Sequence, residues 1–304
     1  YIWLSEVILQ QTRIEQGLPY YQAFTQNFPS LKDLANASED SVLKLWQGLG
    51  YYSRARNMHF TAKQVVNDWS GVFPNKATEL SKLKGLGHYT AAAIASFAFG
   101  DIVPAIDGNV YRVLARLFGI DADILSSTGK KEFLSIATQL ISREDPGIYN
   151  QAMIEFGALQ CVPIAPKCGN CPFANSCYAY ANDAQSRLPV KSKKVAVRNR
   201  YLHYFIIETS AGIAMKLRHE KDIWKGLYDF PLIESETMEE DLESLLYDGF
   251  VGKIVELGVV RRLPKTYTHQ LTHQKLNVTF WWIKVSEKAA ANLPAELKFY
   301  PAEQ

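Results

Sequence analysis

Residues 83–90 read Leu-Lys-Gly-Leu-Gly-His-Tyr-Thr, and an alanine-rich segment follows them as far as Phe99. Two glycines separated by one residue predict a tight turn, and the alanines after it predict a helix. The backbone N–H groups of Gly85 and Gly87 would converge at the start of that helix, where they can bind a phosphate without reading a base. An ordinary helix–helix turn is the alternative, and two further features favour the phosphate site.

The first of these features is a run of four cysteines spaced C-x6-C-x2-C-x5-C, with no other cysteine in the chain. Four thiolates so close together predict a metal centre, which in proteins holds an iron–sulfur cluster or zinc. Structural zinc usually takes two short C-x2–4-C pairs, and only one is present here. The spacing therefore favours an iron–sulfur cluster over zinc, two disulfides or free thiols. The predicted ligands are Cys161, Cys168, Cys171 and Cys177.

Composition sets the remaining limits. A metal centre of thiolates predicts a reducing, cytoplasmic compartment rather than secretion. No apolar run reaches membrane-spanning length, and no signal-peptide pattern opens the chain. The formal net charge is only +2, so a site for a polyanion must come from local clustering of charge. The chain opens at Tyr1 inside an apolar segment without an initiator Met, so we expect further residues to precede it in the full protein.

The hydrophobic pattern predicts a mainly α domain over residues 1–182, a basic linker over 183–199 and an α+β domain over 200–304. In the first domain, Ser38 is expected to cap a helix that runs through Trp46 and ends at Gly48 and Gly50. Further helices are expected at 90–99, 110–118 and 150–159. The second domain is expected to contain strands at 201–207, 212–217, 253–260 and 276–285, with one acidic helix at 238–247.

The second feature is the segment Pro104-Ala-Ile-Asp-Gly-Asn-Val110, between the glycine turn and the cysteines. These three features, in this order, resemble the helix-hairpin-helix DNA glycosylase superfamily that carries a [4Fe–4S] cluster. The resemblance covers the first domain and implies binding to double-stranded DNA, with the cluster structural and Lys167 beside it facing phosphate. It also implies that Asp107 is the catalytic aspartate. A cap on the helix near Val110 is the structural alternative, and both roles are compatible.

Residues 5–12, Ser-Glu-Val-Ile-Leu-Gln-Gln-Thr, closely resemble the S-E-x-x-L-Q-Q-T signature of the adenine DNA glycosylase (MutY-type) family. The resemblance implies that Glu6 is the general acid. Its apolar neighbours favour a desolvated carboxyl that keeps its proton, whereas a carboxylate on a helix surface is the alternative. Endonuclease III-type members place a lysine nucleophile where this chain has Tyr89. Without that amine no Schiff base can form there, so the resemblance implies monofunctional hydrolysis.

A base inside a duplex must be flipped into a pocket before chemistry, and another side chain must fill its place. The resemblance implies that Gln11 and Tyr51 do so, although Tyr51 and Tyr52 are equally suited to a hydrophobic core. Arg54 and Arg56 are expected either to meet phosphates or to pair with nearby acids. The matching pocket positions, expected to contact the sugar, the catalytic aspartate or adenine, are Tyr89, Asn109 and Gln151.

In the second domain, residues 224–231, Trp-Lys-Gly-Leu-Tyr-Asp-Phe-Pro, resemble the W-x-G-L-x-x-F-P element of Nudix-like domains attached to adenine glycosylases. The R-E-x-x-E-E pattern that binds magnesium in true Nudix hydrolases is absent, so we expect no pyrophosphohydrolase activity. In the family this domain recognises 8-oxoguanine through a Phe-Ser-His loop. Leu271-Thr272-His273 stands there, which keeps a hydroxyl and an imidazole but loses the aromatic ring. A loop without a ligand is the alternative.

The sequence therefore predicts a monofunctional glycosylase that removes adenine mispaired with 8-oxoguanine or guanine in base excision repair. We expect it to act as a monomer without membrane association. A bifunctional glycosylase/lyase is one rival, which Tyr89 disfavours. A DNA lesion-binding module without catalytic activity is the other, which Glu6 and Asp107 disfavour.

Overall fold

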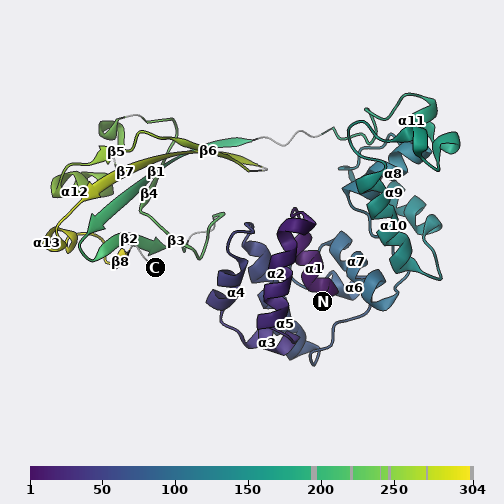
Figure 1. Cartoon of the computed structure of the whole chain (residues 1–304), viewed down its shortest axis with the longest axis horizontal. Coiled ribbons are helices and arrows are strands. Elements are labelled where there is room, and N and C mark those ends of the chain that lie inside the picture. Colours follow the sequence, from purple (N-terminus) through teal and green to yellow (C-terminus); the bar gives the residue numbers. More distant parts are fainter. Residues whose placement is uncertain (193–196, 220–221, 240, 246–247, 272, 302–304) are drawn as a thin grey trace. The chain divides into compact units, whose positions relative to one another are not determined.

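The computed structural model describes residues 1–192, 197–219, 222–239, 241–245, 248–271 and 273–301. The chain divides into two units, residues 1–193 and 194–304 (Figure 1). Within the described residues, no helix is both long and apolar enough to cross a membrane.

The first unit is helical, and no strand occurs in its described residues, as the sequence predicts. Its helices are α1 (Ile2–Leu9), α2 (Ile14–Asn27), α3 (Leu31–Asn36), α4 (Glu39–Trp46), α5 (Ser53–Asp68), α6 (Ala77–Leu80), α7 (His88–Phe99), α8 (Gly108–Phe118), α9 (Ser127–Leu140), α10 (Pro146–Leu159) and α11 (Tyr178–Ala181). Two single-turn 3-10 helices, η1 (Cys168–Asn170) and η2 (Ala174–Ser176), lie in the cysteine loop.

Local sequence signals explain several of the helix ends. The Ser38 side chain accepts a hydrogen bond from the Ser41 N–H (3.1 Å) and caps α4, as predicted. Gly48 and Gly50 follow α4 with positive φ angles of 99° and 71°, which a side chain would disfavour. Pro146 occupies the first turn of α10, where its missing N–H has no helical partner to lose.

Two larger hydrophobic clusters and a small one around Ala93 and Ala105 pack among the described residues of the first unit. One lies among α1–α7 and contains fully buried Phe24 and Trp46, packed edge to face with ring centroids 5.7 Å apart. The other joins α8, α9 and α11 through Leu114 and Phe133. The predicted linker over 183–199 is partly folded, because Ala184 and Leu188 are buried in this second cluster and β1 already begins at Arg198.

The second unit is a mixed β-sheet with short helices, which confirms the predicted α+β class. Its strands are β1 (Arg198–Thr209), β2 (Gly212–Leu217), β3 (Tyr228–Asp229), β4 (Leu232–Ser235), β5 (Arg261–Arg262), β6 (Tyr267–Gln270), β7 (Gln274–Lys284) and β8 (Lys298–Tyr300). Its helices are η3 (Leu242–Leu245), α12 (Gly249–Leu257) and α13 (Glu287–Ala290).

The long strands β1 and β7 form the centre of the sheet and run parallel, in register from Arg198↔Gln274 to Glu208↔Lys284. The order β3-β2-β1-β7-β5 continues outward, with β4 on β1, β6 on β7 and β8 on β2. Phe205 and Ile207 of β1 pack in the cluster that also buries the helix residues Val251 and Ile254. Tyr204 belongs to a separate cluster with the segment around Trp224 and Phe230. Successive side chains of β1 therefore point to opposite faces of the sheet, and each face contributes to a different hydrophobic cluster.

Two predictions for the second unit are wrong. Of the predicted acidic helix at 238–247, the described residues form only the single turn η3. The predicted strand at 253–260 overlaps the helix α12, because Val251 and Ile254 recur three residues apart and both are buried against the sheet. Asp248 caps this helix by accepting the Phe250 N–H at 2.8 Å. Helical spacing therefore outweighed the β-branched composition.

Candidate functional site

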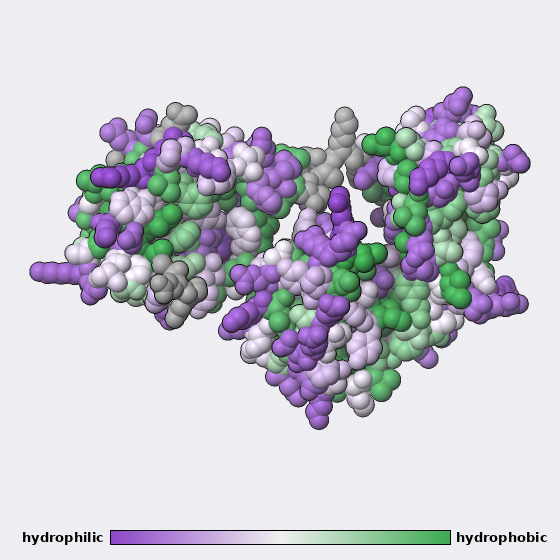
Figure 2. All heavy atoms as spheres, in the orientation of Figure 1, coloured by the Kyte–Doolittle hydropathy of each residue, from purple (hydrophilic) through white to green (hydrophobic). Residues whose placement is uncertain are grey.

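A cavity of about 1000 Å³ opens beside α1, α2 and α10 of the first unit. Glu6 of α1 lines it together with Gln151 and Glu155 of α10. Ile14, Leu18 and Ile148 also line it and are exposed, whereas hydrophilic side chains cover much of the surface elsewhere (Figure 2). The cavity thus combines an apolar rim with acidic and amide groups, as small-molecule and base pockets do.

The Glu6 carboxyl keeps its proton more strongly than an ordinary glutamate. Burial raises the pKa of Glu6, the hydrogen bond from Tyr89 lowers it in part, and the negative charge of Asp107 raises it further. The pKa of Tyr89 is raised well above its usual range by burial and by the same two carboxyl groups. The three residues come from α1, from the first turn of α7 and from the residue before α8. The structure therefore brings Glu6, Tyr89 and Asp107 together.

Asp107 is both the cap of α8 and a member of this group. Its Oδ1 accepts the N–H groups of Asn109 and Val110, each at 2.8 Å, and its Oδ2 accepts the Asn109 side-chain amide at 2.7 Å. Both predicted roles are therefore geometrically compatible, since the cap fixes the carboxylate close to Glu6. Gln151 lies on α10, where its amide donates to Glu155 at 2.7 Å across the cavity wall.

The glycine turn has the backbone that a hairpin needs. Gly85 has a φ of +83°, and a Cβ there would lie 2.7 Å from the Cβ of Asn57 in α5. Gly87 is the residue before α7, and nothing lies within 4 Å of a Cβ added to it. Thr61 also donates to the carbonyl of Lys84 at 2.8 Å, which attaches the turn to α5. The turn is thus packed against α5 at Lys84 and Gly85, whereas no atom of the described residues crowds Gly87.

Gln11 and Tyr51 share an unusual backbone. Both are exposed, and both have positive φ angles, 56° and 49°, in residues that are not glycine. Tyr52 instead packs against the core, so of the two neighbouring tyrosines Tyr51 is the exposed one and Tyr52 is the core residue. The structure thus presents Gln11 and Tyr51 on two turns, one after α1 and one before α5.

The two arginines of α5 differ from each other. Arg56 pairs with Glu39 at 3.1 Å, which agrees with the acidic-partner prediction. For Arg54 both predictions are wrong, since it is buried and donates to backbone carbonyls, among them that of Gln10 at 2.6 Å. A guanidinium placed under the surface in this way holds the backbone rather than meeting phosphate.

The four cysteines line one small, largely apolar cavity beside Phe156 and Phe173, and none forms a disulfide. No group of three or more His, Cys, Asp or Glu side chains in the described ranges is arranged to hold a metal ion. Four thiols around one cavity are the donor set that an iron–sulfur cluster takes in proteins. The donor set therefore fits the predicted cluster. Lys167 is exposed beside it.

Two buried arginines of α8 join the cysteine loop to the rest of the unit. Arg112 donates to the carbonyls of Cys161 and Gly157, both at 2.7 Å, and to Oδ1 of Asn109 at 2.8 Å. Arg116, four residues on, donates to the carbonyl of Val162 at 2.7 Å. Since Asn109 in turn donates to Asp107, a continuous set of hydrogen bonds runs from the cysteine loop to the carboxyl group beside Glu6.

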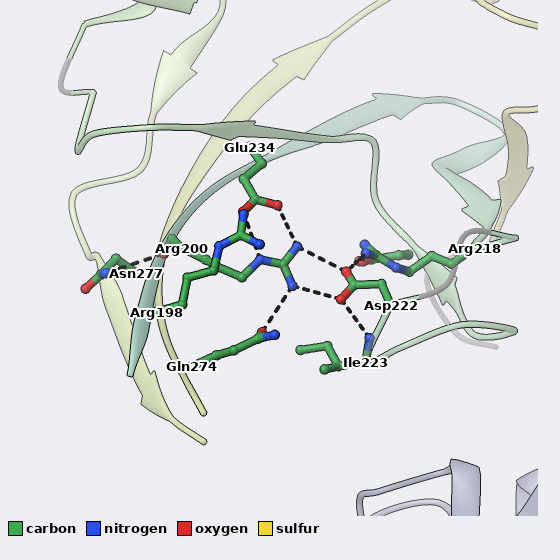
Figure 3. Close-up of polar contacts among 9 residues, drawn as sticks. Arg198, Arg200, Arg218, Asp222, Ile223, Glu234, Gln274 and Asn277 are labelled. Carbon is green, nitrogen blue, oxygen red and sulfur yellow. Dashed lines mark hydrogen bonds and ion pairs between the residues drawn. The ribbon is translucent and has the colours of Figure 1, made fainter. Parts of the chain in front are cut away.

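Gln274, which follows the predicted lesion loop in the sequence, belongs to a network of polar and charged groups in the second unit (Figure 3). Arg200 donates to Asp222 at 2.8 and 3.1 Å, to Glu234 at 2.9 and 2.6 Å, and to Gln274 at 3.2 Å. Gln274 opens β7, and the neighbouring His273 is exposed, its carbonyl accepting the Arg198 N–H at 2.9 Å. Thr272 lies outside the described residues.

Sequence reasoning missed the buried arginines and Glu155. Arg112 and Arg116 lie four residues apart on an otherwise apolar helix face, a signal that could have predicted buried acceptors nearby. No comparable signal marks Arg54, because its acceptors lie on turns that are distant in sequence.

Two family models match the chain, one in each unit. The model of the HhH-GPD superfamily of base excision DNA repair proteins matches residues 4–139, and that of the NUDIX domain matches residues 203–304. An adenine DNA glycosylase of Buchnera aphidicola subsp. Baizongia pistaciae is 33% identical, covering 94% of this chain and 79% of its own. The adenine DNA glycosylase of Mus musculus is 43% identical, covering 100% and 68%.

An adenine DNA glycosylase of Buchnera aphidicola subsp. Acyrthosiphon pisum is 35% identical over 76% of this chain and 66% of its own length. The chain thus spans about two thirds to four fifths of the length of these three relatives. Among solved structures, a thermostable thymine-DNA glycosylase is 26% identical with a TM-score of 0.54, covering 60% of this chain and 83% of that one. Endonuclease III bound to DNA is 24% identical with a TM-score of 0.53, covering 60% and 85%, a likeness of fold alone.

Proposed function

The chain belongs to the adenine DNA glycosylase family, and from this membership we propose that it hydrolyses the N-glycosidic bond of adenine mispaired with 8-oxoguanine or guanine in duplex DNA. The observation that supports the proposal most is the convergence of Glu6, Tyr89 and Asp107, of which Glu6 lines a cavity large enough for a base. The products would be free adenine and an abasic site.

Glu6 is the proposed general acid. Departure of adenine requires a proton on the base as the bond between C1′ and nitrogen breaks, because an anionic purine is a poor leaving group. A carboxyl whose pKa is raised by burial holds that proton closer to neutral pH than an ordinary glutamate does. After transfer of the proton, the Glu6 carboxylate can accept one from the attacking water.

Asp107 is the proposed stabiliser of the sugar cation. Cleavage leaves positive charge on the ring oxygen and C1′, and a nearby carboxylate lowers the energy of that state. The hydrogen bonds from Asn109 and Val110 keep the Asp107 carboxylate in one orientation. Glu6 and Asp107 thus divide the roles of acid and charge stabiliser, as the two carboxyl groups of glycoside hydrolases do.

Tyr89 makes the proposed reaction monofunctional. A lyase step requires an amine that attacks C1′ and forms a Schiff base, and a phenol has none to offer. Tyr89 instead hydrogen-bonds Glu6 and lies close to Asp107. Its proposed role is to hold the general acid in place beneath the flipped base.

The base would reach this site by flipping, and of the proposed DNA contacts Gln151 lines the cavity. Gln11 and Tyr51 would enter the space that adenine leaves, and Gln151 would contact the flipped base. The N–H groups of the hairpin, between Gly85 and Gly87, would bind a backbone phosphate, since nothing covers Gly87. These contacts position the duplex, and base contacts supply the specificity.

The second unit is the proposed reader of the opposite base. Thr272 and His273 stand in the sequence where the family carries its lesion loop, and Arg200 of β1 bonds both Glu234 of β4 and Gln274, the residue after His273. A hydroxyl and an imidazole can hydrogen-bond the edge of 8-oxoguanine or guanine. Because Leu271 replaces an aromatic residue, stacking on the lesion would be weaker than in relatives.

Cys161, Cys168, Cys171 and Cys177 would hold a [4Fe–4S] cluster that acts as a structural brace for the loop beside Lys167. Measuring iron, zinc and acid-labile sulfide in purified protein tests this. About four irons and four sulfides per chain are expected, whereas one zinc would contradict the assignment.

Base release from a duplex with one adenine opposite 8-oxoguanine tests the proposed function. Glu6→Gln and Asp107→Asn should each lower the single-turnover rate of adenine release by about 100-fold or more while binding is retained. Lys130→Gln, on the exposed surface of α9, serves as a control for charge and should release adenine at the parent rate. Unchanged release in either carboxyl variant would remove that residue from the mechanism.

A further inference from the structure

One buried guanidinium lies beneath both of the turns that carry Gln11 and Tyr51. Arg54 of α5 is only 9% exposed, although arginine is rarely buried without an acidic partner. Its side chain has no ion pair among the described residues and donates to backbone carbonyls instead. A charge buried in this way must be offset by several well-aligned acceptors.

Those acceptors come from two separate turns. One terminal nitrogen of Arg54 donates to the carbonyls of Ile8 (2.8 Å) and Gln10 (2.6 Å), where α1 ends. The other lies 3.3 Å from the carbonyl of Gly50 in the turn before α5. The carbonyls at the end of a helix carry partial negative charge and lack helical partners, so a cation there is favourable.

Each of these turns leads directly into a residue with left-handed backbone. Gln11 follows Gln10, and Tyr51 follows Gly50. A left-handed conformation in a residue with a side chain is strained and persists only where the surroundings enforce it. The Arg54 guanidinium is bonded one residue before each of them, so it supplies that enforcement at both positions.

Aromatic contacts fix the guanidinium plane. The Cζ of Arg54 lies 5.1 Å from the ring centre of Trp46 and 5.7 Å from that of Tyr51. Trp46 also donates its indole N–H to the carbonyl of Gly50 at 3.0 Å. A flat guanidinium with donors on both sides can make these contacts at once, whereas the single ammonium of lysine cannot.

We propose that Arg54 is a positioning residue that couples the two turns, so that Gln11 and Tyr51 enter the duplex as one unit. This inference rests on the proposed function only in assigning Gln11 and Tyr51 to the duplex. Coupling of two inserting side chains through one buried group means that disturbing either turn weakens the contribution of the other. Arg54 itself touches no DNA in this account.

A double-mutant cycle tests the coupling. Affinity is measured for a duplex with a non-hydrolysable adenine analogue opposite 8-oxoguanine, and 2-aminopurine beside the mispair reports distortion of the stack. Arg54→Lys should weaken binding about tenfold and reduce the fluorescence change, as expected for loss of hydrogen bonds to a charged group. In a Tyr51→Ala or Gln11→Ala background the same substitution should weaken binding less than about twofold.

Arg56→Lys is the matched control, because it lies two residues away on α5 and pairs with Glu39 at the surface. It should bind like the parent chain and add independently to Tyr51→Ala. Equal losses from Arg54→Lys in the parent and the Tyr51→Ala background would overturn the proposal, since a general loss of stability would act in both alike.

If Arg54→Lys does not fold, as judged by thermal unfolding, the cycle between Gln11→Ala and Tyr51→Ala decides the question with Arg54 intact. Coupled turns predict that the double variant loses clearly less affinity than the product of the single losses, and independent effects would refute coupling. Neither readout requires base release. A chain that binds and distorts the duplex without releasing adenine would therefore refute the proposed function and leave the coupling supported.

Discussion

Replacing Arg112 with methionine removes the guanidinium that connects the cysteine loop with Asn109. The side chain is 8% exposed and makes hydrogen bonds of 2.7 to 2.8 Å to the carbonyls of Cys161 and Gly157 and to the Asn109 side chain. Methionine fills a similar length with apolar atoms but donates nothing. The three acceptors therefore lose their donor at once.

The cost follows from how well water can reach each acceptor. The bond to Gly157 is buried, and an unsatisfied buried carbonyl costs about 1–3 kcal/mol. The bonds to Cys161 and Asn109 are partly buried, so each adds about 1 kcal/mol once solvent substitutes for the guanidinium. A total of about 3–5 kcal/mol should lower the Tm of a unit of this size by about 6–20 °C.

Thermal unfolding followed by circular dichroism measures this change, with Arg143→Met as a control at an exposed arginine. The control should shift Tm by less than about 1 °C, as surface substitutions usually do. Adenine release at a temperature where the Arg112 variant is folded should also fall, because Asn109 no longer orients Asp107. A Tm within about 2 °C of the parent chain, with unchanged release, would refute the reasoning.

Three further predictions concern Glu6, Tyr89 and Arg200. Glu6→Gln should stabilise the fold at alkaline but not at acidic pH. The pKa of Glu6 is raised in the folded state, so the parent chain loses stability as pH rises through that pKa, and glutamine does not ionise. A series of Tm values measured against pH checks this. Tyr89→Phe removes the hydrogen bond that lowers the pKa of Glu6, so the alkaline limb of the release rate should move to higher pH; a pH–rate profile with no shift or the opposite shift would contradict it. Arg200→Met removes the buried arginine shared by Asp222 and Glu234, which keep Arg218 and Arg198 as second partners, and should cost the second unit about 1.5–3 kcal/mol in urea unfolding. Arg261→Met at an exposed position should cost little.

Local signals predicted much of the fold. The Ser38 cap, the glycines after α4 and the apolar spacing of 110–118 depend on neighbours within one or two turns, so the sequence reveals them. The strands at 201–207 and 276–285 are long enough for their composition to identify them. The strand prediction for 253–260 was wrong because β-branched residues also occur in helices when the apolar residues are spaced three apart, as Val251 and Ile254 are.

The proposed catalytic pair could be predicted from the sequence for a different reason. Glu6 and Asp107 stand in short motifs, and the structure adds that Tyr89 lies with both of them. The contacts that support these residues could not be predicted from the sequence. Arg112 bonds Cys161 across 49 residues of sequence, and Arg54 bonds Gln10 across 44. Such partners are backbone carbonyls, which every residue has, so no residue type marks them.

The activity proposed for this chain is removal of adenine by hydrolysis alone. A single-turnover assay on a duplex with one adenine opposite 8-oxoguanine tests this activity, with products resolved before and after alkali. We expect strand breaks only after alkali, because hydrolysis leaves an intact abasic strand and Tyr89 provides no amine. Breaks without alkali would contradict the assignment of Tyr89, and no release of adenine despite tight binding would contradict the enzyme itself.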